Sequence, residues 1–88
     1  MKVLTTVQEI DGEGLVSLLG ESVLLMCANY FYTGTLVGVN ETCVKIDNPS
    51  IVYNTGEWSA DSWADVQRMN VGTLYVQIAA IESFCNGR

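Results

Sequence analysis

The sequence contains no histidine, a single proline and only four basic residues among 88. Without histidine, the chain lacks the commonest general acid–base group and the commonest metal ligand. The cysteines, Cys27, Cys43 and Cys85, are widely spaced and form no Cys-x-x-Cys pair, so a zinc site would need ligands from distant segments. No glycine-rich phosphate loop and no nucleophile motif are present. We therefore expect no enzyme activity, no metal site and no cofactor.

Long apolar runs are missing as well. The longest run, residues 23–28, has the length of a strand and is far too short to cross a bilayer. The first residues, MKVLTTVQEID, lack the apolar region of a signal peptide. We therefore expect a cytoplasmic protein with no membrane contact.

Acidic residues outnumber basic ones by ten to four, which gives a net charge of −6. This charge repels a phosphate backbone at long range and weighs against ordinary nucleic-acid binding. By contrast, hydrophobic residues make up 49% of the chain. Because a domain of this size buries only about 60–65% of its unfolded surface, part of the apolar content should lie at a subunit interface. The composition predicts a single domain that forms an oligomer.

The N-terminal part is expected to contain one short helix. Asp11 can cap it, Leu15, Leu18 and Leu19 share one face, and Gly20 can end it. Residues 1–11 are interpreted as an N-terminal arm or an additional strand.

The sequence after this helix predicts a mainly β fold with five antiparallel strands. Gly34 and Gly38 lie inside the second strand, where glycine indicates a sharp bend or a close approach of two backbones. Pro49 cannot donate to a ladder and is placed at an edge or a bulge. The predicted strands are residues 22–28, 32–39, 42–48 with a continuation at 51–53, 72–79 and 80–84.

Residues 54–70 form a polar, acidic segment that carries both tryptophans. It is predicted to be an extended loop, or a loop with a helical turn, because Trp63, Val66 and Met69 recur at helical spacing. Trp58 and Trp63 either fold back onto the sheet or project as aromatic anchors for a protein partner.

Three stretches resemble the first motif of the Sm-like family, which contains the Sm and LSm proteins and bacterial Hfq. They are Gly20-x-x-Val23-x-Leu25, Tyr32-x-Gly34-x-Leu36-x-Gly38-Val39-Asn40 and Val44-x-Ile46-x-Asn48. The stretch Val76-Gln77-Ile78-Ala79-Ala80-Ile81-Glu82 stands in the place of the second motif. The resemblance covers residues 12–84 and implies one Sm-like domain over residues 1–88, with 54–70 as the variable loop.

The resemblance implies a short N-terminal helix and a five-stranded, strongly bent antiparallel sheet that forms a small open barrel. It also implies a hexameric or heptameric ring, in which the fourth strand of one subunit pairs with the fifth strand of the next. In the family, RNA is held at the pore by the loops between strands two and three and between strands four and five. The matching positions here are Asn40, Glu41 and Thr42, with Lys45 nearby, and Ala79 and Ala80.

Two functions follow as hypotheses. The first is an Sm-like ring that binds RNA through these pore loops. At the second loop, however, Ile78-Ala79-Ala80 replaces the family's basic signature and offers no side-chain donor to a phosphate. The alternative is therefore an Sm-shaped assembly module that has lost RNA binding and recruits a protein partner through residues 54–70, with Trp58 and Trp63 as anchors.

Overall fold

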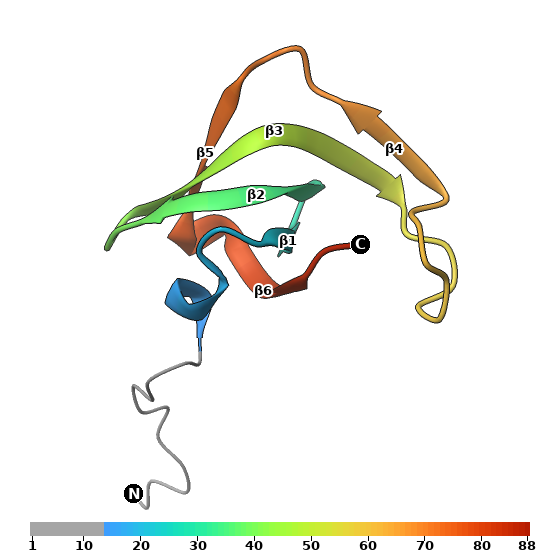
Figure 1. Ribbon diagram of the computed structural model, residues 1–88, viewed down its shortest axis with the longest axis horizontal. Helices are drawn as coiled ribbons and strands as arrows, with labels where there is room; N and C mark the ends of the chain where they lie inside the picture. The colour runs from blue at the N-terminus through green and yellow to red at the C-terminus, as the bar shows by residue number, and fades with distance from the viewer. Residues whose placement is uncertain (1–13) are drawn as a thin grey trace, which may run out of the picture.

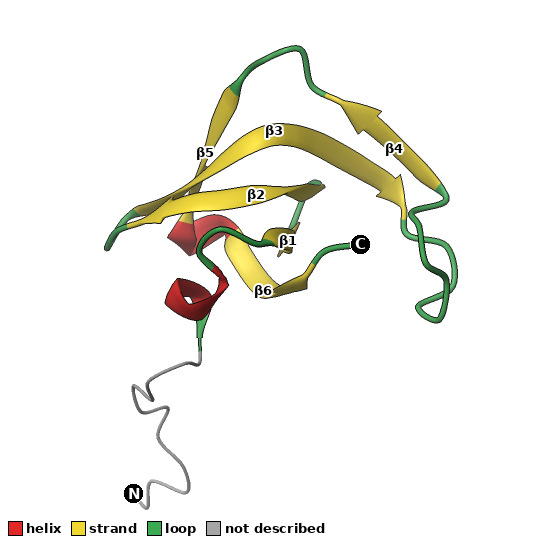
Figure 2. Ribbon diagram, in the orientation of Figure 1, coloured by secondary structure: helices red, strands yellow, loops and turns green. Residues whose placement is uncertain are grey.

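The computed structural model describes residues 14–88, and its strands form one antiparallel sheet. The strand order is β4-β3-β2-β1-β6, and β5 also pairs with β3. The protein is mainly β, with only two single-turn 3-10 helices in the described residues (Figure 2). The elements are η1 (Leu15–Leu18), β1 (Ser22–Cys27), β2 (Phe31–Val39), β3 (Cys43–Asn54), β4 (Asp65–Arg68), β5 (Thr73–Gln77), η2 (Ile78–Ala80) and β6 (Ile81–Asn86).

Strand β3 is the longest element and connects the two ends of the sheet. One of its sides pairs with β2, while its other side pairs first with β5 and then with β4. Between these two partners the strand passes through Asn48, whose φ of 50° is positive, and through the buried Pro49. Figure 1 shows β3 as a long arch, with β5 beside one half, β4 beside the other, and the loop that joins them above the arch. The predicted bulge at Pro49 is confirmed, since the β2–β3 register shifts between the pairs Thr33↔Ser50 and Thr35↔Asp47.

The second strand bends where its glycines lie. The β2–β3 register shifts between Thr33 and Thr35 and again between Leu36 and Gly38. A Cβ atom built on Gly34 would lie 2.8 Å from the backbone oxygen of Asp47. The predicted close approach of two backbones is thus confirmed at Gly34, and it permits the sheet to curl.

The core is formed by side chains of β1, β2, the first half of β3, and β5. Strand β1 is apolar on both faces, and its residues Val23, Leu24 and Leu25 are all fully buried. The prediction that this strand is covered on both sides is therefore confirmed. The main cluster of buried residues consists of Val23, Leu25, Cys27, Leu36, Val44, Ile46 and Val76.

The N-terminal helix is shorter and tighter than predicted. It is a 3-10 turn over Leu15–Leu18 that follows Gly14, and only Leu15 and Leu18 pack against the core. Leu19 is 45% exposed, so the predicted three-leucine face is wrong. Gly20 does have the positive φ expected at the end of a helix. A turn this short holds its position through packing, because one turn has no stability of its own. The proposed cap Asp11 and the arm 1–11 lie outside the described residues.

The segment 54–70 contains a strand that the sequence did not reveal. Asp65–Arg68 forms β4 and pairs with the second half of β3, so the predicted helical turn through Trp63, Val66 and Met69 is wrong. All four residues of β4 are exposed, and a strand with no buried side chain leaves no alternating hydrophobic pattern. The sheet consequently has six strands rather than five. Neither helix in residues 14–88 has the length or apolar character needed to cross a membrane.

Candidate functional site

The loop between β2 and β3 is organised by the side chain of Asn40. Its Oδ1 accepts hydrogen bonds from the backbone N–H of Thr42 at 2.8 Å and of Cys43 at 2.9 Å. The hydroxyl of Thr42 also donates to this oxygen, at 3.1 Å. Asn40 and Thr42 therefore stabilise the turn. The side-chain oxygen of Asn40 accepts the hydrogen bonds that a backbone carbonyl would accept in an ordinary turn. Glu41 is exposed at the tip.

The structure brings together the two loops that the resemblance assigns to RNA binding. The backbone N–H of Ile78, the first residue of η2, donates to the oxygen of Thr42 at 2.9 Å. The neighbouring register pair is Cys43↔Gln77 of β3 and β5. The turn around Asn40 and the segment with Ala79 and Ala80 thus lie side by side, although they are far apart in the sequence.

An exposed aromatic side chain, Tyr75, lies next to these loops. It is 64% exposed, and the Nζ atom of Lys45 lies 6.0 Å from the centre of its ring. Tyr75, Ala79 and Ala80 are among the residues that line a hollow of about 360 Å³. Sequence reasoning missed Tyr75, although the alternation in residues 73–77 placed its side chain opposite to Leu74 and Val76. Tyrosine at such a position can stack on a nucleic-acid base.

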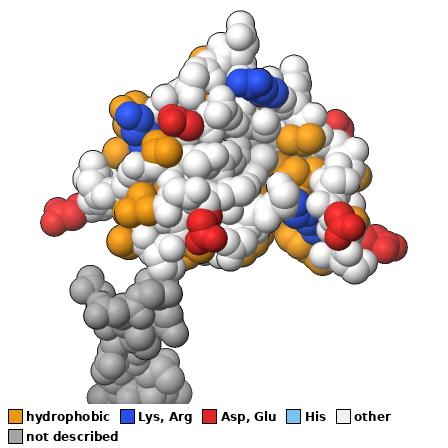
Figure 3. All heavy atoms as spheres, viewed as in Figure 1, with side chains coloured by type: hydrophobic (Ala, Val, Ile, Leu, Met, Phe, Trp, Pro, Cys, Tyr) orange, Lys and Arg blue, Asp and Glu red, His pale blue; other side chains and the backbone are white. Residues whose placement is uncertain are grey.

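Basic side chains are spread over the molecule. On the face seen in Figure 3, they stand apart from one another rather than forming a stripe. Arg68 donates to Oδ1 of Asn48 at 3.0 Å, and Arg88 is engaged with the 55–63 segment. Lys45 is therefore the basic side chain of the described residues that lies next to the paired loops.

The two tryptophans are placed in different surroundings. Trp58 is 62% exposed, whereas Trp63 is half-buried. Both rings face the guanidinium group of Arg88, whose Cζ lies 4.1 Å from the ring centre of Trp63 and 5.4 Å from that of Trp58. Arg88 follows β6 at the other end of the sheet, and Figure 1 shows the chain leaving β6 towards the loop between β3 and β4. No local pattern in the sequence predicts this contact.

Cys27 is a core residue. Burial raises the pKa of its thiol, and the carboxylate of Glu82 raises it further. Since the thiolate is the reactive form of cysteine, this side chain is suited to packing and not to nucleophilic chemistry. Within residues 14–88, no group of three His, Cys, Asp or Glu side chains is arranged to hold a metal ion.

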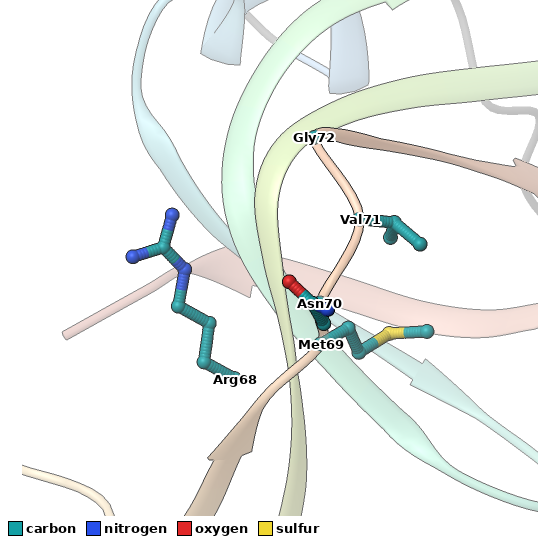
Figure 4. Close-up of a pocket in the computed structure, with 5 residues that line it drawn as sticks. All are labelled: Arg68, Met69, Asn70, Val71 and Gly72. Atoms are coloured by element: carbon teal, nitrogen blue, oxygen red, sulfur yellow. The ribbon is translucent and has the colours of Figure 1, made fainter.

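A second open hollow, of about 450 Å³, lies at the connection between β4 and β5. Figure 4 shows the side chain of Arg68 on one side of this connection and those of Met69 and Val71 on the other. The backbone here is held to β3, because Met69 donates to the oxygen of Pro49 at 2.9 Å. This hollow is formed by the bend of the backbone, and its polar side chains do not point towards a common centre.

No family model, no curated protein and no solved structure matches this chain.

Proposed function

We propose that this protein is an Sm-like assembly module whose copies join edge to edge into a hexameric or heptameric ring. The observation that carries this proposal is that the sheet ends in two open edges with exposed hydrophobic side chains. Val66 on β4 is 44% exposed, and Phe84 on β6 is 39% exposed. In the pairing order, β6 stands at one end, while β5 and β4 follow one another along the outer side of β3 at the other.

An open strand edge presents unpaired N–H and C=O groups, which form a template for another strand. When β6 of one copy pairs with β4 and β5 of a second copy, the two edges that meet are satisfied. The first copy then still has a free β4 and β5 edge, and the second copy still has a free β6 edge. Such a head-to-tail contact produces a ring when its rotation closes. The resemblance assigns the pairing between subunits to the strands expected at residues 72–79 and 80–84, which correspond to β5 and β6, and this agreement supports the proposal.

Exposed apolar surface supports the same conclusion. The described residues include several large hydrophobic side chains that are at least 39% exposed, and Val71, between β4 and β5, is 47% exposed. Coverage by a neighbouring copy accounts for the 49% hydrophobic content of so small a chain.

The mass in solution tests the ring. Multi-angle light scattering during size-exclusion chromatography is expected to give a hexamer or heptamer of the 9.6 kDa chain. The mass should stay constant over a tenfold dilution, because a ring has no free end from which copies are lost. A stable mass of 9.6 kDa at all concentrations would contradict the proposal.

RNA binding at the paired loops is a second candidate function, which Tyr75 favours. Its exposed ring lies beside Lys45 and beside the hollow lined by Ala79 and Ala80. A base stacked on such a ring contributes about 1–3 kcal/mol. Replacing Tyr75 with alanine is therefore expected to weaken binding of fluorescent U-rich or A-rich oligonucleotides about tenfold or more.

Fluorescence anisotropy at low salt measures this effect. The matched control is Tyr53→Ala, because Tyr53 is also exposed, at 53%, but belongs to the far half of β3. Equal affinities of the two variants for the oligonucleotide, or no binding by the unmodified protein at micromolar concentrations, would remove this second candidate.

A further inference from the structure

We propose that residues 55–63 form a binding site for a guanidinium group, which Arg88 of the same chain occupies, and which accepts an arginine side chain of another polypeptide when Arg88 leaves. This assigns a ligand chemistry to the segment with Trp58 and Trp63. It does not depend on ring formation, because every contact lies within one chain.

Three backbone carbonyl groups converge on the guanidinium of Arg88. Its Nη1 donates to the oxygen of Thr55 at 2.7 Å and to that of Ser62 at 3.2 Å. Its Nη2 donates to the oxygen of Glu57 at 3.3 Å. Carbonyl oxygens from both ends and the interior of the segment therefore accept from one planar donor group, which has its N–H bonds fixed in a fork.

The tryptophan rings complete the site. The guanidinium carbon lies 4.1 Å from the ring centre of Trp63 and 5.4 Å from that of Trp58. Both distances are within the range of about 6 Å at which a cation is attracted by the face of an aromatic ring. Guanidinium can stack flat on such a ring and still use its in-plane N–H groups, whereas an ammonium group has no flat face. The combination of three carbonyl acceptors and two aromatic rings is therefore selective for arginine over lysine.

The segment has internal hydrogen bonds that do not involve Arg88. The N–H of Gly56 donates to Oδ1 of Asn54 at 2.9 Å, and the N–H of Ala60 donates to the oxygen of Glu57 at 3.0 Å. Gly56 has a φ of 71°, and a Cβ atom on it would lie 3.1 Å from the Cβ of Ala64. These contacts hold the segment in a compact turn, so the acceptor carbonyls keep their arrangement when the guanidinium leaves.

The site is open to exchange on one side. Trp58 is 62% exposed, so solvent reaches the guanidinium past this ring. Arg88 reaches the site because Gly87 lies close against β1, where its N–H donates to the oxygen of Ser22 at 2.8 Å. Arg88 thereby connects the end of β6 to the loop between β3 and β4. An arginine side chain of another polypeptide would compete with Arg88 for the site.

Chemical rescue tests the site in the full-length chain. In the Arg88→Ala variant, we expect the tryptophan emission to shift to longer wavelength, because Trp63 loses its cover. Millimolar ethylguanidinium should reverse this shift with saturation, and it should bind about tenfold more tightly than ethylammonium. The control variant Arg68→Ala, which removes an arginine that donates to Asn48 rather than to residues 55–63, should keep the emission of the unmodified protein. An Arg88→Ala emission that is unchanged, or that responds equally to both cations, would overturn the proposal.

The peptide ligand is tested with the same folded variant. A short peptide with one arginine should bind to Arg88→Ala and compete with ethylguanidinium, while the same peptide with lysine should bind about tenfold more weakly. Equal binding of both peptides would also overturn the proposal.

If the Arg88→Ala variant does not fold, a second measurement on the unmodified protein tests whether Arg88 occupies the site. In the unmodified protein, ring currents of the two tryptophans should move the NMR signal of the Arg88 Nε–H proton upfield of the Arg68 signal. The Trp63→Leu variant should return it towards the Arg68 position. An Arg88 signal that coincides with that of Arg68 in the unmodified protein would show that the site is empty and would end the proposal.

Discussion

Replacing Gly34 with alanine is expected to lower the free energy of unfolding by about 2–3 kcal/mol, which is a large share of the stability of a small domain. The new Cβ atom would lie 2.8 Å from the backbone oxygen of Asp47 and 3.4 Å from Pro49 Cα. Backbone atoms cannot rotate away as a side chain can, so β2 and β3 must separate at the point where the sheet bends. Urea unfolding followed by circular dichroism measures the loss.

Gly38→Ala is the matched control, because Gly38 also lies in β2 at a register shift. A Cβ atom there would meet only the side chain of Lys45, with its nearest atom at 3.4 Å, an ordinary contact. Alanine also reduces the freedom of the unfolded chain, so the stability should stay within about 0.5 kcal/mol or rise slightly. Similar losses for the two variants would show that the contact with Asp47 is not what makes Gly34 necessary.

If copies join as proposed, replacing Phe84 with proline is expected to reduce the solution mass from that of the proposed ring to the 9.6 kDa of one chain. The N–H of Gly87 donates to the oxygen of Ser22, and the register pairs Phe84 with Leu25. Because hydrogen-bonded and non-hydrogen-bonded pairs alternate along an antiparallel ladder, the N–H of Phe84 faces the open edge of β6. Proline removes this donor and places its ring on the edge where the neighbouring strand would pair.

Phe84→Leu serves as the control, since it keeps both the N–H group and an apolar side chain. Light scattering should give the ring mass for the leucine variant and the single-chain mass for the proline variant. Far-ultraviolet circular dichroism should be the same for both, because the β1–β6 ladder does not use this N–H group. A proline variant that keeps the mass of the unmodified protein would exclude β6 as the assembly edge.

Much of the sheet could be predicted because its signals are local. Strand β1 reads as continuous apolar sequence, and burial on both faces requires that pattern. Gly34 and Pro49 indicated the bend individually, since each residue type restricts what the backbone beside it can do. Strand β4 could not be predicted in the same way. Its four residues are all exposed and become a strand through pairing with β3, which is a property of the partner.

The candidate site shows the same division. The role of Asn40 as a turn residue depends on hydrogen bonds to residues two and three positions away, which sequence reasoning can anticipate. The exposure of Tyr75 beside Lys45 depends on the register of β3 and β5. The contact of Arg88 with the two tryptophans joins residues 25 or more positions apart, and no periodicity or motif predicts it.

The sequence by itself determined that this chain is mainly β, that its second strand bends at a glycine, and that it carries more apolar surface than one small core can cover. Only the tertiary structure decided which strands end the sheet, which aromatic ring lies beside the paired loops, and that Arg88 closes over Trp58 and Trp63. The physical reason is the range of the interactions. Backbone restriction and hydrophobic alternation act within a few residues, whereas edges and binding sites are made by segments that meet only after the sheet has curled.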